Sequence, residues 1–175
     1  MSNSKGLERL QVVLAGEPAD VDGTSGLTGD YFDLSAYERV MCVCAFGDGT
    51  AASDLDMLVY QASDNGGTGA KVLNALQTGR IYTMYSTTYA LYAALTGWTK
   101  VTQATADEQY TPTDNGEAVG VMVLELKADD LDNANSFTHI RCDLSDPGAA
   151  KIAALLYIGL DPKTATLPEL MDTGF

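Results

Sequence analysis

Histidine and cysteine are scarce in this 175-residue sequence, which limits the chemistry that the chain can perform. There is one histidine, His139, and there are three cysteines, Cys42, Cys44 and Cys142. A single histidine excludes the familiar zinc sites that use two or more, and no nearby nucleophile and acid accompany it. An odd cysteine count disfavours a secreted disulfide framework. We interpret the cysteines as small buried hydrophobic residues, and we predict that the chain is not an enzyme and has no catalytic residue, metal ligand or cofactor.

Basic residues are also few. The sequence has 10 lysines and arginines against 24 aspartates and glutamates, which gives a formal net charge of −14. A phosphate backbone would be repelled over most of such a surface, so we expect no nucleic-acid partner. The same charge suits docking onto a basic or mixed protein surface.

No apolar run approaches the roughly 18 residues that a membrane-spanning helix needs. The first six residues, Met1 to Gly6, contain no apolar targeting segment. We therefore expect no membrane partner and a protein that is made in the cytoplasm.

The acidic residues form no recognisable catalytic or calcium-binding pattern. The cluster Asp129 to Asn133 offers oxygen ligands, but an EF-hand loop that began at Asp129 would have Ala134 where glycine is required and Ile140 where glutamate is required. Turns and helix capping explain these residues better. The neighbouring carboxylates Asp54 and Asp56 are not placed by the sequence across a cleft from another acid.

Short runs rich in Val, Leu, Tyr and Thr recur between clusters of Gly, Asp and Asn, which is typical of β-strands joined by turns. One capped helical turn is expected within 128–135. The run from Lys151 to Leu160 could also form a helix, but its length and the following Gly-Leu-Asp-Pro favour a strand. The expected strands are Leu10–Leu14, Glu38–Phe46, Asp54–Gln61, Gly69–Gln77, Glu117–Lys127, Thr138–Leu144 and Lys151–Leu160.

Two of these strands are apolar on both sides. Glu38–Phe46 and Glu117–Lys127 carry hydrophobic residues at odd and even positions alike, so we expect them to be central strands covered on both faces. The whole pattern predicts an all-β fold, a single antiparallel β-sandwich or jelly-roll-like domain over residues 1–160.

Two segments do not fit that core. Residues 81–100 form a Tyr-rich insert in which Tyr82, Tyr85, Tyr89 and Tyr92 have the spacing of one side of a helix, and Trp98 follows them. This stripe either packs onto the sandwich or forms a contact surface, since Tyr and Trp are enriched at interfaces. Residues 161–175 form an extended C-terminal arm that docks on its own domain or on a neighbour. Its apolar residues are Leu167, Leu170, Met171 and Phe175.

The order of several segments resembles a known family. The segments that carry the likeness are Tyr31–Val40, Leu58–Asp64 with Gly69–Lys71, Val123–Leu126, Phe137–Arg141 and Ala154–Gly159. Together they resemble the capsid decoration, or cement, proteins of tailed bacteriophages. The Tyr-rich insert and the C-terminal arm depart from the family pattern.

The resemblance implies a structural virion protein that binds the outer surface of an icosahedral capsid and stabilises it. The implied partners are the major capsid protein and other copies of the chain, with a homotrimer favoured. The interface residues we expect are Tyr82, Tyr85, Tyr89, Tyr92, Trp98, Leu167, Leu170, Met171 and Phe175. The alternative is a carbohydrate-binding or host-surface adhesion module, because β-sandwiches often present aromatic side chains to sugar rings.

Overall fold

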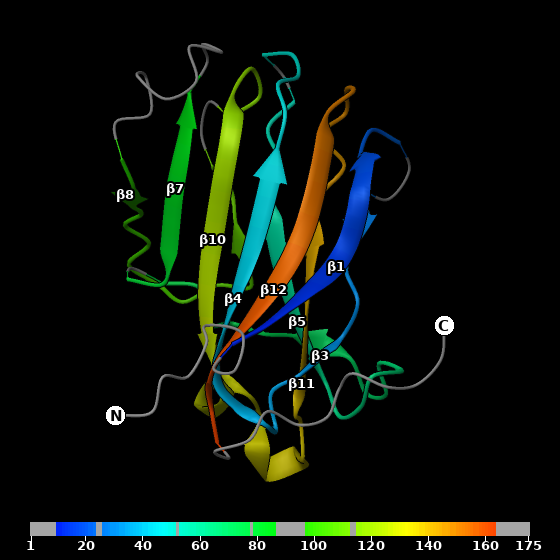
Figure 1. Cartoon of the computed structure of the whole chain (residues 1–175), viewed down its shortest axis with the longest axis vertical. Helices are drawn as coiled ribbons and strands as arrows, with labels where there is room; N and C mark the ends of the chain where they lie inside the picture. Colours follow the sequence, from blue (N-terminus) through cyan, green and yellow to red (C-terminus); the bar gives the residue numbers. More distant parts are fainter. Residues whose placement is uncertain are drawn as a thin grey trace, which may run out of the picture.

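The chain folds into two antiparallel β-sheets that face each other (Figure 1). The computed structural model describes residues 10–23, 26–51, 53–77, 79–86, 97–112 and 115–163. Sheet A has the strand order β1 (Gln11–Asp20), β12 (Ile152–Pro162), β4 (Tyr37–Phe46), β10 (Val119–Lys127), β7 (Ile81–Ser86) and β8 (Thr99–Lys100). Sheet B has the order β2 (Leu27–Thr28), β11 (His139–Leu144), β5 (Met57–Ala62) and β6 (Lys71–Val72), with β3 (Phe32–Asp33) beside β11 and β9 (Gln109–Tyr110) beside β5.

This architecture confirms the all-β sandwich that the turn-separated apolar runs predict. The segment whose helical alternative was left open is the strand β12, which pairs with β4 along most of its length. The acidic stretch after β10 forms two short 3-10 turns, Ala128–Asp130 and Asn133–Asn135, where one capped turn was expected. Among the described residues, no helix is long and apolar enough to span a membrane. The division at residue 160 stays a prediction, and β12 continues to Pro162.

The core lies between the two sheets and is built by alternation along each strand. Val40, Cys42 and Cys44 of β4 point inward and are fully buried. From sheet B, the inward residues of β11 are Ile140, Cys142 and Leu144. All three cysteines are free and buried, as the sequence predicts.

One hydrogen bond joins the two sheets through the core. The backbone N–H of Cys142 on β11 donates to the hydroxyl of Tyr157 on β12 over 2.7 Å. Cys142 lies between the short strands β2 and β3, which pair with the two ends of β11 and leave its middle open. Gly29 crosses this opening so closely that a Cβ there would lie 2.3 Å from the Cys142 carbonyl oxygen. The Tyr157 hydroxyl thus satisfies a buried donor that has no strand partner on that side.

A buried lysine closes the end of the sandwich where β12 begins. Lys151 is 1% exposed, and its ammonium donates to the backbone carbonyls of Asn115 (2.6 Å) and Gly116 (2.8 Å). Its nitrogen also lies 5.0 Å from the centre of the Phe46 ring. Burial lowers the pKa of Lys151. These contacts show a structural role, in which the lysine holds the loop before β10 against β4 and β12.

Candidate functional site

The side of sheet A that faces away from sheet B is apolar, and no described element covers it. We call this side the outer face. Along β4, β10 and β12 every second residue points there. Most of these residues are half-buried, Lys127 and Ile152 are exposed, and Val123 is buried at 9% exposure. The apolar residues of the outer face are Val12, Leu14, Met41, Val43, Ala45, Tyr82, Met84, Val119, Val121, Val123, Ile152, Ala154, Leu156, Ile158 and Leu160.

This arrangement corrects one expectation from the sequence. The apolar residues on both faces of β4 and β10 predicted that both strands are covered on both sides. Only the side that faces sheet B is covered by described residues. The second apolar set is left uncovered by the described part of the chain, which makes it a candidate for a binding face.

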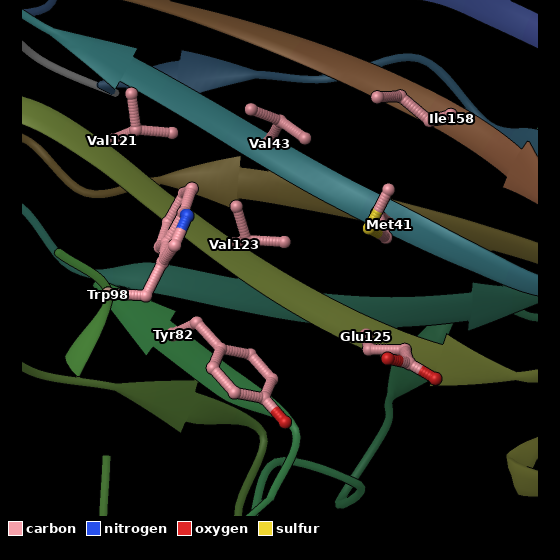
Figure 2. A pocket seen from close by; sticks show the side chains of 8 residues that line it. All are labelled: Met41, Val43, Tyr82, Trp98, Val121, Val123, Glu125 and Ile158. Atoms are coloured by element: carbon pink, nitrogen blue, oxygen red, sulfur yellow. The ribbon is translucent and has the colours of Figure 1, made fainter. Parts of the chain in front are cut away.

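A shallow groove of about 560 Å³ lies in the middle of the outer face. Its lining residues are Met41, Val43, Tyr82, Trp98, Val121, Val123, Glu125 and Ile158. Figure 2 shows the Trp98 indole reaching over β10 beside Val121 and Val123, with Tyr82 on the same side of the groove. Trp98 is 53% exposed, so a large aromatic side chain forms one wall of an open apolar depression.

The edge strand β1 extends the apolar surface beyond the groove. Val12 lies opposite Ile158, and Leu14 lies opposite Leu156, so each pair shares the outer face. Val12 is 48% exposed and Leu14 is 52% exposed. Exposed aliphatic residues on an edge strand favour association with another chain unless something protects the edge.

The charged residues of the outer face lie at one end, where β4 begins and β10 ends. Arg39 forms ion pairs with Glu125 (2.8 Å) and Asp161 (2.6 Å), and its hydrogen bonds to these two carboxylates raise its pKa. Lys127 lies opposite Arg39, and Lys100 lies opposite Tyr82. This end of the face therefore has three basic residues, Arg39, Lys100 and Lys127, against the two acidic residues Glu125 and Asp161, in a chain that is strongly acidic overall.

The opposite end of sheet A carries negative charge. Asp48, just after β4, and Glu117, just before β10, are exposed there. Of the basic residues that the structure describes, the one at this end is Lys151, which is buried. Sheet A thus has a basic end, an apolar middle and an acidic end.

The predicted interface residues fall into three groups. Tyr82 and Trp98 lie in the groove of the outer face. Tyr85 points the other way and packs against the core, with its ring centre 6.3 Å from that of Phe46. The remaining ones lie outside the described residues: Tyr89, Tyr92, Leu167, Leu170, Met171 and Phe175.

The helical interpretation of the tyrosine spacing is wrong where the structure describes it. Residues 81–86 form strand β7, in which Ile81 is fully buried, and residues 99–100 form β8. These parts of the predicted insert belong to the sandwich. In a strand, positions three apart lie on opposite faces, which is why Tyr82 and Tyr85 point in opposite directions.

The cysteines and the histidine lie outside this face, and their contacts are those of structural residues. A hydrogen bond with Cys42, together with burial, raises the pKa of the Cys142 thiol, and burial raises the pKa of Cys44, so neither is an activated thiolate. A ring nitrogen of His139 lies 2.8 Å from the Thr138 hydroxyl. Within the described ranges, no three side chains of the types His, Cys, Asp and Glu cluster closely enough to hold a metal ion.

The sequence matches no protein-family model and no curated protein. Among solved structures, the SPBc2 prophage-derived protein YomS aligns with 83% of this chain and 92% of its own length, at 12% identity and a TM-score of 0.24. The VP2 subviral particle of infectious bursal disease virus aligns with 89% of this chain at 12% identity, and the Gt strain of that virus with 97% at 14% identity, each with a TM-score of 0.25.

The alignments cover 42% and 45% of the two virus chains, so this chain spans less than half of their length. All three neighbours come from a prophage or a virus. TM-scores near 0.25 are too low for these likenesses to carry an argument about function.

Proposed function

We propose that this chain is a structural protein of a virion that binds the outer surface of an icosahedral capsid and stabilises the shell. The observation that carries the proposal is the outer face of sheet A, an apolar surface that runs across five strands without cover from any described element. The capsid as the place of action rests on the resemblance of the sequence to decoration proteins.

The size of the outer face supports a role in protein binding. Its five long strands, β1, β12, β4, β10 and β7, contain between 6 and 11 residues each. With strands about 4.8 Å apart and about 3.3 Å per residue, nine residues of five strands give a flat area of about 700 Å². This flat area, which includes the charged residues at the ends of the face, is close to the roughly 800 Å² that each partner contributes to a specific protein–protein interface.

A protein that binds only the assembled shell stabilises the shell by mass action. Such a clamp contacts several neighbouring subunits at once, so that modest individual contacts add up through multivalency. The proposed partners are accordingly the major capsid protein and further copies of this chain, on the exterior of the virion.

A glycan-binding role has less support from the groove. Trp98 and Tyr82 could stack against a sugar ring, but a sugar also needs several polar groups that bind its hydroxyls. Glu125 is the charged residue of the lining, and it is paired with Arg39; the Tyr82 hydroxyl donates to the Gly79 carbonyl. We expect no specific hits on a glycan array, and a reproducible hit that Trp98→Ala abolishes would favour the adhesin alternative.

The proposal is tested by sedimentation with bare capsids of the phage that encodes the chain. We expect the wild-type protein to sediment with the shells and to raise their melting temperature. Val121→Glu, which puts a charge in the middle of the outer face, should weaken binding at least about tenfold, since an unpaired buried charge costs several kcal/mol.

The matched control is Val72→Glu. Val72 is 44% exposed on β6 of sheet B, far from the outer face in the sandwich, so the same substitution should leave shell binding unchanged. A wild-type protein that stays in the supernatant at micromolar shell concentrations would refute the proposed function.

A further inference from the structure

We propose that the outer face of sheet A binds the outer face of a second copy of this chain. The two copies are related by a two-fold axis that lies between the two sheets and runs across the strands. The inference rests on the proposed function and narrows it, because it assigns the outer face to the contact between copies and leaves the remaining surfaces of the pair to contact the capsid protein. Its test needs no capsid.

The first argument is the area. A face of about 700 Å² on each copy would bury about 1,400 Å² in total, which lies within the usual range of about 1,200–2,000 Å² for a stable specific complex. Sheets that pack face to face lie about 10 Å apart and keep their strands roughly aligned, which suits an open face without a third layer.

The second argument is the charge along the strands. The proposed axis reverses the strand direction, so the basic end of one sheet A lies over the acidic end of the other. On β4, Arg39 faces the end that carries Asp48; on β10, Lys127 faces the end that carries Glu117. The face is self-complementary in this orientation, as a two-fold contact requires.

The third argument is the distribution of acidic residues over the molecule. Two copies with a net charge of −14 each repel one another over most approaches. On the outer face the charges nearly balance, because Arg39, Lys100 and Lys127 lie at one end with Glu125 and Asp161, and Asp48 and Glu117 lie at the other end. The pair therefore forms through the surface where repulsion between copies is weakest.

The solution mass tests this pair directly. The chain has a mass of 18.5 kDa, and we expect light scattering at tens of micromolar to give about twice that value. Val12→Glu places a carboxylate at an apolar edge of the interface, twice per pair, and should raise the dissociation constant at least about tenfold. Val72→Glu, at a site of similar exposure on sheet B, should leave the pair intact.

A charge exchange tests the orientation without disturbing the core. Lys127→Glu alone and Glu117→Lys alone should each weaken the pair about tenfold, because each sets like charges against each other in two symmetric places. The double variant Lys127→Glu, Glu117→Lys restores opposite charges and should regain the wild-type dissociation constant within about threefold. Both sites are exposed, and an unchanged melting temperature of each variant checks that it keeps the folded state.

Several outcomes would overturn the inference. A solution mass of one chain would refute the pair. If removal of residues 164–175 then gave the mass of two chains, the C-terminal arm would be the segment that binds the outer face. A mass of three chains favours the trimer that the resemblance implies. A pair that Val12→Glu does not weaken uses another surface, and additive losses in the charge-exchange double variant refute the orientation. A wild-type monomer that still binds shells leaves the proposed function standing, whereas a pair that binds no shell refutes that function alone.

Discussion

Replacing Tyr157 with phenylalanine tests how the two sheets are joined. Tyr157 is 1% exposed, and its hydroxyl accepts the backbone N–H of Cys142 from the other sheet. The variant keeps the ring but removes the acceptor. The Cys142 N–H is then left buried without a partner, because β2 and β3 do not reach it.

The expected loss follows from this unsatisfied donor. Leaving a buried polar group unpaired costs about 1–3 kcal/mol. A loss of about 2 kcal/mol lowers the melting temperature of a domain of this size by about 4–8 °C. It shifts the urea midpoint by about 1 M if the denaturant slope is about 2 kcal/mol/M. Equilibrium urea unfolding followed by circular dichroism measures this loss, and hydrogen exchange at the Cys142 amide should become faster.

Tyr82→Phe is the matched control. Its hydroxyl donates to the carbonyl of Gly79, three residues away at a half-exposed position, where water can replace the bond. We expect a change below about 0.5 kcal/mol. Equal losses in the two variants, or an unchanged exchange rate at Cys142, would refute the reasoning that the Tyr157 hydroxyl supplies a missing strand partner.

Two further predictions follow from the core. The free energy of unfolding should fall as the pH rises above about 9. Burial raises the pKa of Cys44, Tyr37 and Tyr157, and it raises the pKa of Tyr110 to about 12. A hydrogen bond with Cys42, together with burial, raises the pKa of Cys142. These five groups stay protonated in the folded chain, but in the unfolded chain they ionise near pH 9.0 (Cys) or pH 10.0 (Tyr). The stabilisation is therefore present below these pH values and is lost above them. The lowered pKa of Lys151 has the opposite effect, but Lys151 is one group against five. Urea unfolding at pH 7, 9 and 10.5 measures the trend, and a constant free energy of unfolding would contradict it. The neighbours Leu155 and Leu156 should differ, since Leu155→Ala empties a fully buried site and costs about 2–5 kcal/mol, whereas Leu156→Ala on the outer face costs less than about 1 kcal/mol in the monomer. Equal costs would show that the outer face is part of the core.

Much of the fold could be predicted because the strand signal is local. In β11, apolar and polar residues alternate cleanly, and the structure buries Ile140, Cys142 and Leu144 as that alternation predicts. The turn between β5 and β6 was visible in its Asp, Asn and Gly residues, and Asp64 caps it by accepting the backbone N–H of Thr68. Such patterns depend only on neighbours in the sequence.

The orientation of the tyrosines could not be predicted in this way. A spacing of three between Tyr82 and Tyr85 fits one side of a helix, but the strand β7 places them on opposite faces. Whether this segment is helical depends on its long-range pairing with β10, which begins more than thirty residues later. The context of the sheet therefore overrides the local period.

Two features of the candidate site could not be predicted from the sequence, namely its exposure and its local charge. Apolar residues such as Val43 and Val121 predict a strand that is buried on both faces, because the sequence does not show how many layers cover a sheet. The net charge of −14 pointed to a basic partner, but a net charge is a sum over the whole surface, whereas binding depends on the charge near the contact. At the Arg39 end of the outer face, however, the three basic residues outnumber the two acidic residues Glu125 and Asp161. A partner of this face should therefore be apolar at its centre and acidic opposite Arg39 and Lys127, and the acidic end of sheet A in another copy of the chain meets both conditions.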